Sequence, residues 1–356
     1  MVKRTDKDYE KYILKKIGII FALFVIVLIM GVFSVAKGAF EIAPLDVLKA
    51  IFGKANDQVN MIVLSVRLPR VVMAIVSGIG LAISGCVLQS VLKNPLASAS
   101  TLGISQGAAF GAAFAIVCLG AGQSTTLIST DSSLTITNPY ITTVSAFICA
   151  MLTALIIIGL SKSRDSSPSS MILAGVALSA MFSGGTTLMQ YFGTDMEIAS
   201  IIFWTFGDLG RVTWKEISIV SVVVLITSVF FFINSWNYNA ISEGTQTAKG
   251  FGVNVKTVRL LGMAVSALCV AAIVSFVGII SFIGLIAPHA VATIIGRDNK
   301  YLMPASALMG AILLLLSDCI ARMVMSPIIL PIGAITSFMG APMFIYILRK
   351  GGSNVD

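Results

Sequence analysis

Apolar stretches alternate with short polar segments along almost the whole chain. A helix needs about 20 mostly apolar residues to cross a bilayer. Ten stretches approach that length: residues 17–36, 70–91, 102–121, 140–161, 170–190, 216–234, 258–276, 279–296, 302–321 and 329–348. The seventh and eighth are separated by little more than Val277 and Gly278. The pattern predicts an all-α integral membrane protein with about ten transmembrane helices.

The first stretch has one alternative interpretation, a cleaved signal peptide. Residues 1–16 are basic, and small residues follow the apolar run at 34–36. However, that run is about twice as long as the apolar region of a signal peptide, and its polar head is long. These features favour a retained first helix.

The composition supports the membrane class. Of the 356 residues, 57% are hydrophobic and 11% are charged, whereas soluble domains carry about 25% charged residues. The five cysteines lie within or beside apolar runs and form no CxxC pair, so we interpret them as small buried hydrophobes. The net charge of +8 fits membrane orientation better than nucleic-acid binding.

The distribution of Lys and Arg predicts the orientation. With an even number of spans and the N-terminus inside, most of the basic residues fall in cytoplasmic segments. This agrees with the rule that cytoplasmic loops of membrane proteins carry an excess of Lys and Arg. Both termini are then cytoplasmic. We expect a cytoplasmic segment at 1–16, one ten-helix permease domain at 17–350 with a cytoplasmic loop at 237–256, and a cytoplasmic tail at 351–356.

Small residues predict close helix packing. Gly103, Gly107 and Gly111 form a GxxxGxxxG run, and such runs let membrane helices approach closely. An alternative role is approach of the bare backbone to a substrate path. One helix can serve both roles, with packing on one face and the substrate path on another.

The sequence lacks the usual signatures of catalysis and ion coupling. His289 is the only histidine, and there is no GxxxxGK[ST] or HExxH motif, so we expect no metal or cofactor bound by this chain. Ion-coupled carriers usually keep acids deep in the membrane. Here the deepest acid is Asp318, with Arg322 four residues on. We therefore expect the energy for transport to come from another polypeptide.

The polar loop at 237–256 contrasts with its apolar surroundings. As a helix, it would be capped by Ser242, wind from Glu243 to Lys249 and close at a left-handed Gly250, with a second turn at Gly252. Such a short helix with exposed small residues suits a groove in a cytoplasmic partner. An ordinary solvated loop is the alternative.

A set of motifs in a fixed order resembles one known family, the FecCD-type permeases of ABC importers for ferric siderophores, heme and cobalamin. The motifs are RLPR at 67–70, SGCVLQSVLKNPLASASTLGISQGAAFGA at 84–112, LAGVALS at 173–179, ISEGTQTAKGFGVNV at 241–255, FIGLIAPHAV at 282–291, GRDNKYLMPASALMGA at 296–311, LSDCIAR at 316–322 and PIGAITSFMGAPMFIYILRK at 331–350. The resemblance runs from about residue 20 to 350. It implies a type II ABC importer permease fold.

The resemblance also implies partners and site residues. Two permease subunits, identical or different, would line one path above two cytoplasmic ATPases that use ATP, and an extracytoplasmic substrate-binding protein would deliver the substrate. The resemblance assigns ATPase coupling to the residues Ser242, Glu243, Ala248 and Gly252, although Gly244 and Gln246 depart from the family's acidic-alanine pattern.

The same resemblance assigns docking of the binding protein to Arg67, Arg70 and Arg322, because a guanidinium binds carboxylates bidentately. A local alternative is that Arg322 pairs with Asp318 and that the RLPR arginines extend from a helix start. Residues 194–211 could form an interfacial helix, which the family places near its outer gate.

The substrate stays open within the family. An iron chelate, either a siderophore or heme, is the leading interpretation, and cobalamin is its rival. In other classes, an ion-coupled secondary transporter and a membrane enzyme are the alternatives. The missing deep carboxylates and the missing catalytic set count against these two classes.

Overall fold

The computed structural model describes residues 2–37, 42–51, 53–121, 139–161, 168–326 and 328–351, and it contains no strand in these ranges. The helices are α1 Val2–Ala36, α2 Pro44–Ile51, α3 Asp57–Ile62, the π-helix η1 Val63–Arg67, α4 Leu68–Leu92, α5 Ile104–Cys118, α6 Pro139–Ser161, α7 Pro168–Phe192, α8 Asp195–Phe206, α9 Trp214–Ile233, α10 Ser235–Glu243, α11 Thr245–Gly250, α12 Val255–Val277, α13 Ile283–Ile295, α14 Asn299–Met323 and α15 Ile332–Gly351. The expected all-α class is confirmed.

Each of the ten apolar stretches falls on a helix, but the helices differ in length. Within the described ranges, seven are long and apolar enough to cross a membrane: Glu10–Ala36, Asp57–Leu92, Tyr140–Leu160, Pro168–Phe192, Trp214–Ile233, Val255–Val277 and Asn299–Met323. Three apolar helices are shorter, namely Ile104–Cys118, Ile283–Ile295 and Ile332–Ile345. The count of ten spans therefore stays a prediction.

Backbone geometry explains why two of the three helices are short. Gly103, with φ 75°, precedes α5. Phe282 and Gly296, with φ 66° and 83°, bound α13. A left-handed residue cannot continue a right-handed helix. The same rule applies at Gly278, with φ 83°, which ends α12 after Val277 and sets the boundary that the sequence left weak.

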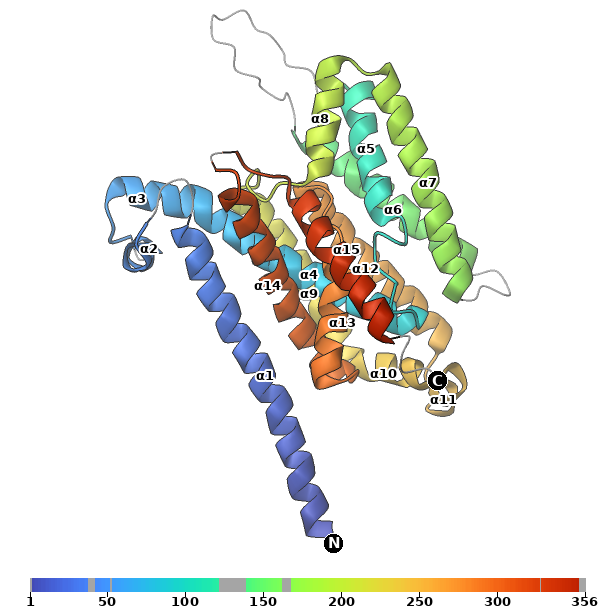
Figure 1. Ribbon diagram of the computed structural model, residues 1–356. Helices are drawn as coiled ribbons and strands as arrows, with labels where there is room; N and C mark the ends of the chain where they lie inside the picture. Colours follow the sequence, from blue (N-terminus) through green and yellow to red (C-terminus); the bar gives the residue numbers. More distant parts are fainter. Residues whose placement is uncertain are drawn as a thin grey trace, which may run out of the picture.

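The helices are arranged around α4. This helix contacts α14, α12, α13 and α9, and the helices α5, α6, α7 and α8 form a group at one side of it (Figure 1). The long α1 leans against α14 from the opposite side. Because α4 is surrounded, most of its side chains are buried. Helix α4 is therefore the central element of the bundle.

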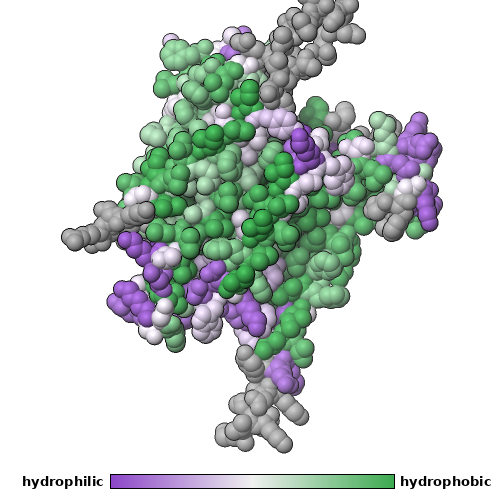
Figure 2. Space-filling view, turned by 180° about the vertical axis from the view of Figure 1, so that it is seen from behind, coloured by the Kyte–Doolittle hydropathy of each residue, from purple (hydrophilic) through white to green (hydrophobic). Residues whose placement is uncertain are grey.

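The outer surface has the distribution of a membrane protein. Many large apolar side chains are exposed on α1, α6, α7 and α9. In Figure 2 the middle of the visible face is hydrophobic, and hydrophilic residues gather at its lower left and on a projecting part at the right. This agrees with an apolar band facing lipid between two polar ends.

Glycines allow the central helices to touch backbone to backbone. A Cβ added to Gly78 of α4 would lie 2.5 Å from the carbonyl oxygen of Gly310 in α14, and one on Gly107 of α5 would lie 3.0 Å from the carbonyl oxygen of Cys149 in α6. Gly111 also lies against α6, and Gly103 lies against Gly175 of α7. The GxxxGxxxG positions therefore lie at helix–helix contacts.

We expect Gly78→Leu to lower the thermal unfolding temperature of the detergent-solubilised protein strongly. The side chain would meet the α14 backbone, and overpacking costs about 1–3 kcal/mol or more. Gly159→Leu is the matched control, because Gly159 lies in α6 with no atom within 4 Å of its added Cβ. Equal unfolding temperatures for the two variants would contradict the packing described here.

Candidate functional site

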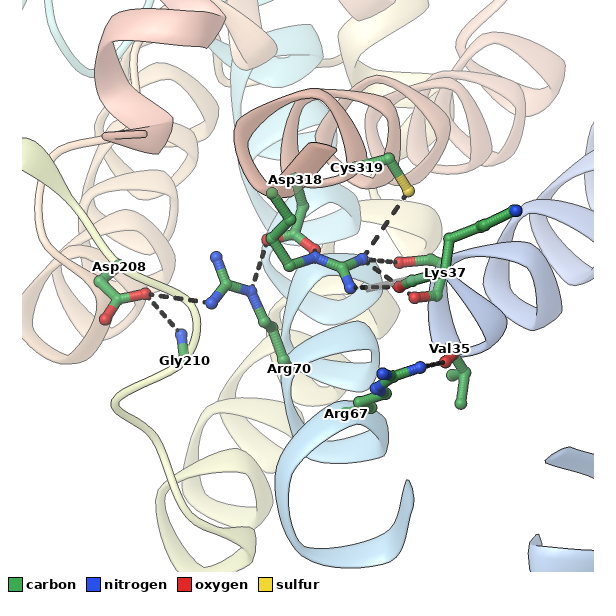
Figure 3. A network of polar contacts seen from close by, with 10 residues as sticks. Val35, Lys37, Arg67, Arg70, Asp208, Gly210, Asp318 and Cys319 are labelled. Atoms are coloured by element: carbon green, nitrogen blue, oxygen red, sulfur yellow. Dashed lines mark hydrogen bonds and ion pairs between the residues drawn. The ribbon is translucent and has the colours of Figure 1, made fainter. Parts of the chain in front are cut away.

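One carboxylate is shared by two arginines inside the bundle. Asp318 of α14 is fully buried and accepts a hydrogen bond from Arg70 Nε at 2.7 Å and another from Arg322 Nε at 2.9 Å. Arg70 belongs to the first turn of α4, so this carboxylate links α4 to α14 (Figure 3). Both guanidinium groups are almost entirely buried.

A second carboxylate connects this cluster to the linker between α8 and α9. Asp208 Oδ1 lies 3.7 Å from Arg70 Nη1 and accepts a hydrogen bond from the Gly210 amide at 2.7 Å. The Asp208 side chain is 49% exposed. Its own amide donates to the carbonyl of Val277 at 2.8 Å, at the end of α12. Asp208 is therefore the solvent-accessible partner of Arg70, and Asp318 is the buried one.

The end of α1 is held by two arginines. Arg67 Nη1 donates to the carbonyls of Val35 at 2.8 Å and Ala36 at 3.0 Å. Arg322 Nη1 and Nη2 donate to the carbonyls of Lys37 at 2.9 Å and Ser34 at 3.0 Å. The last carbonyls of a helix lack internal partners and carry a partial negative charge, so cations stabilise them. Arg67 and Arg322 are caps of α1.

The three arginines predicted to dock a binding protein thus lie together in one cluster, and all three have internal partners. For Arg322, the structure contains the local pair with Asp318 that the sequence offered as the alternative. The docking role of Arg67, Arg70 and Arg322 stays a prediction.

The sequence indicated only part of this cluster. The Asp318–Arg322 pair follows from its four-residue spacing. The Arg70–Asp318 pair joins positions 248 residues apart, and no local pattern marks it. The RLPR motif was the only signal that Arg67 and Arg70 matter.

The polar loop forms two short helices. Gly244, with φ 141°, separates α10 from α11. Two details of the expected helix are wrong. Ser242 does not cap its start, because Ser242 lies in α10 and its Oγ donates to the carbonyl of Tyr238 at 3.0 Å. Gly250 is the last helical residue, and the left-handed residue is Gly252, with φ 78°.

Within this segment, Glu243 and Gly252 are exposed, and so are Ser242 and Lys249. Ala248 is instead fully buried, in a small apolar cluster with Ala240, Ile241 and Val255. The expectation of an exposed small residue is therefore wrong at this position, because α11 folds back onto α10 and the start of α12. Ala248 holds the segment in shape, and the polar side chains form its outer face.

An asparagine network fixes α10 to the central helices. Asn239 of α10 donates to Asp298 Oδ1 at 2.8 Å and accepts from the Asn299 amide nitrogen at 2.8 Å. Asn299 is 1% exposed, and its Oδ1 accepts from Ser90 Oγ of α4 at 3.2 Å. The polar segment is therefore attached to α4 and α14, the same two helices that hold the arginine cluster. No local pattern in the sequence predicted this network.

Metal-binding chemistry has little support in the described part of the chain. No group of three or more His, Cys, Asp or Glu residues there could hold a metal ion. His289 follows Pro288 inside α13.

The fold is that of an ABC transporter permease, a multi-pass membrane protein. It aligns with a solved structure, an inward-facing conformation of a protein described as a metal-chelate type ABC transporter, with a TM-score of 0.80, 30% identity and coverage of 94% of this chain and 99% of that chain. Residues 25–350 match the model of the FecCD transport family. The chain belongs to this family, as its motifs led us to expect.

Proteins similar to this chain are named for different substrates. The chain is 44% identical over 344 residues to a protein of Methanocaldococcus jannaschii described as an ABC transporter permease, covering 97% of each. It is 33% identical over 350 residues to the Fe(3+)-citrate import permease of Bacillus subtilis, covering 98% of each. Other relatives are named as permeases for hemin, molybdate, vitamin B12 and iron(3+)-hydroxamate.

We expect Asp318→Asn to destabilise the protein, because it leaves Arg70 and Arg322 buried without a counter-charge. Breaking a buried ion pair from one side costs about 3–5 kcal/mol. Asp46→Asn is the matched control, since it removes an exposed pair with Lys49 that contributes about 0–1 kcal/mol. Thermal unfolding of both variants checks this, and a loss for Asp318→Asn no larger than the control's would refute the charge network.

Proposed function

We propose that this chain is the permease subunit of an ATP-driven importer that moves an iron chelate, a siderophore or heme, into the cytoplasm. The observation that carries the proposal is the match to the FecCD transport family over residues 25–350. Relatives named for Fe(3+)-citrate and hemin, at 33% and 32% identity, support the substrate class. Cobalamin is the alternative, because relatives named for it are nearly as similar, at 33% and 29%.

The partners follow from the family. An ABC permease works with an ATPase subunit and a second permease subunit. We propose two copies of the ATPase, a second permease that is either identical or related, and an extracytoplasmic substrate-binding protein. ATP is used by the ATPase, and this chain supplies the path.

The segment α10–α11 is the proposed contact with the ATPase. Its outer face is polar and exposed, with Glu243 and Lys249 at the surface. Its inner face is held by Ala248 and by the asparagine network. A segment anchored in this way transmits a push from a docked partner to α4 and α14, because it cannot move without disturbing them.

We propose that this segment lies in the cytoplasm. Figure 1 shows α10 and α11 at the end of the molecule where α1 begins and α15 ends. The basic residues of α1, at Lys11, Lys15 and Lys16, lie toward the same end. The excess of positive charge supports a cytoplasmic location for both termini. The arginine cluster, at the far end of α1, is then extracytoplasmic.

Docking of the binding protein at the arginine cluster requires an exchange of partners. Arg67 and Arg322 satisfy the carbonyls of α1, and Arg70 is bound to Asp318. The contact between Arg70 and Asp208 is longer and half exposed. A carboxylate from a binding protein would therefore replace Asp208 more readily than it would replace Asp318.

We expect Glu243→Arg to abolish uptake while the permease still folds, because the exposed side chain at the end of α10 would face the ATPase with the wrong charge. Glu10→Arg is the matched control, since it makes the same charge change on an exposed residue of α1. Uptake and copurification of the ATPase are measured for both variants. Normal uptake by Glu243→Arg would show that α10–α11 is not the coupling contact.

The substrate is tested by uptake of labelled ferric citrate, ferric hydroxamate, hemin and cobalamin in cells with the gene, without it, and with it restored. We expect deletion to reduce uptake of one iron chelate at least tenfold and restoration to recover it. Loss of cobalamin uptake alone would instead establish the alternative substrate.

A further inference from the structure

An apolar crevice lies between α9 and α14. Its volume is about 310 Å³, at the lower end of the range for small-molecule pockets. Ile83 of α4 forms part of its wall, and Ser228 and Phe232 of α9 face Met303 and Pro304 of α14. The lining exposes almost no polar surface, so the crevice suits a hydrocarbon chain.

The crevice is continuous with the lipid-exposed surface of α9. Val229 is 51% exposed, Phe232 is 52% exposed and Ile233 is 74% exposed, and all three belong to the lining. Apolar side chains this exposed on a membrane-length helix face acyl chains. A lipid therefore reaches the crevice directly from the bilayer, without crossing a polar barrier.

One end of the crevice has the features of a membrane interface. Trp236, three residues beyond Ile233, is 66% exposed, and tryptophan is enriched at the level of lipid headgroups. Lys300 is exposed and lies one helical turn before Pro304, on the same face of α14. Asn239 donates to Asp298 and accepts from the Asn299 backbone amide, which places the start of α14 beside α10. Trp236 and Lys300 therefore belong to the same end.

The charges at this end favour an anion. Arg297, three residues before Lys300, is also exposed. The one nearby acid in this stretch, Asp298, uses its Oδ1 to accept hydrogen bonds from Asn239 and from the backbone amide of Lys300. The ammonium group of Lys300 lies 5.7 Å from the ring centre of Tyr301, and that of Lys16 of α1 lies 5.0 Å from the same ring. Lys300 is exposed, so a phosphate can approach it.

We propose that this crevice is a binding site for an anionic phospholipid. One acyl chain fills the space between α9 and α14, and the phosphate lies beside Lys300. The lipid belongs to the leaflet next to α10 and α11, and only the identification of that leaflet as cytoplasmic rests on the function proposed above. A bound lipid would brace α9 against α14 one turn away from the asparagine network.

The test is native mass spectrometry of the purified protein after incubation with equal amounts of phosphatidylglycerol and phosphatidylcholine. We expect the wild-type chain to retain phosphatidylglycerol preferentially. Lys300→Gln should reduce that preference about fivefold, the usual effect of one basic residue at an anionic lipid surface. Ser228→Phe should fill the crevice and abolish retention of the lipid.

Two matched variants separate the site from general effects. Val222→Phe adds the same bulk to the lipid-exposed face of α9 outside the crevice, and Lys256→Gln removes an exposed lysine of α12 outside it. Both should retain lipid like the wild type. Inorganic phosphate at equal concentration should not displace the lipid, because it lacks the acyl chain.

Three outcomes would overturn the proposal. Retention unchanged in both Ser228→Phe and Lys300→Gln would mean that lipid binds only the general surface. Displacement by inorganic phosphate would reduce the site to an ion contact at Lys300. Loss of a dimer mass in Ser228→Phe, with lipid retention unchanged, would make the crevice a contact between subunits. Lys300→Gln keeps the test valid if Ser228→Phe does not fold, because it changes only an exposed side chain.

Discussion

The buried carboxylate of Asp318 is the interaction on which one end of the molecule depends. Removing a charge from water is costly, and the cost is recovered only when partners with good geometry surround it. Arg70 and Arg322 supply those partners from two helices, and Arg322 also caps α1. Asp318 therefore fixes the relative positions of α1, α4 and α14, and it reaches the α8–α9 linker through Arg70 and Asp208.

The pair α4–α14 carries this constraint along the length of the bundle. At one end it holds the charge cluster, and at the other end Asn299 joins it to Ser90 and to α10. Between the ends, Gly78 and Gly310 bring the two backbones into contact. Close backbone contact leaves few flexible side chains to absorb a displacement. These contacts connect α10 continuously to the arginine cluster.

The sequence predicted the features that depend on neighbouring residues, namely the helices and one ion pair. The apolar stretches predicted the helices, and the four-residue spacing predicted the Asp318–Arg322 pair. The motifs indicated the family. The predicted caps of the polar loop were wrong because the segment is divided into two helices at Gly244. No neighbouring residue indicates the positive φ angle of this glycine. The partners of Arg70 and Asn239 were missed because they lie far away in the sequence, where only the packed fold brings them together.

The internal engagement of the arginines changes how a docked partner could act. Free surface arginines would only hold a binding protein in place. Arg70, in contrast, touches a linker whose Asp208 amide is bonded to the end of α12, so a carboxylate that replaced Asp208 would also release that linker from Arg70. The linker follows directly after α8, which packs against α5 and α15. In the proposed docking mode, a partner at this position would therefore alter the restraint on α8, of which Glu197, Ile201 and Trp204 are buried.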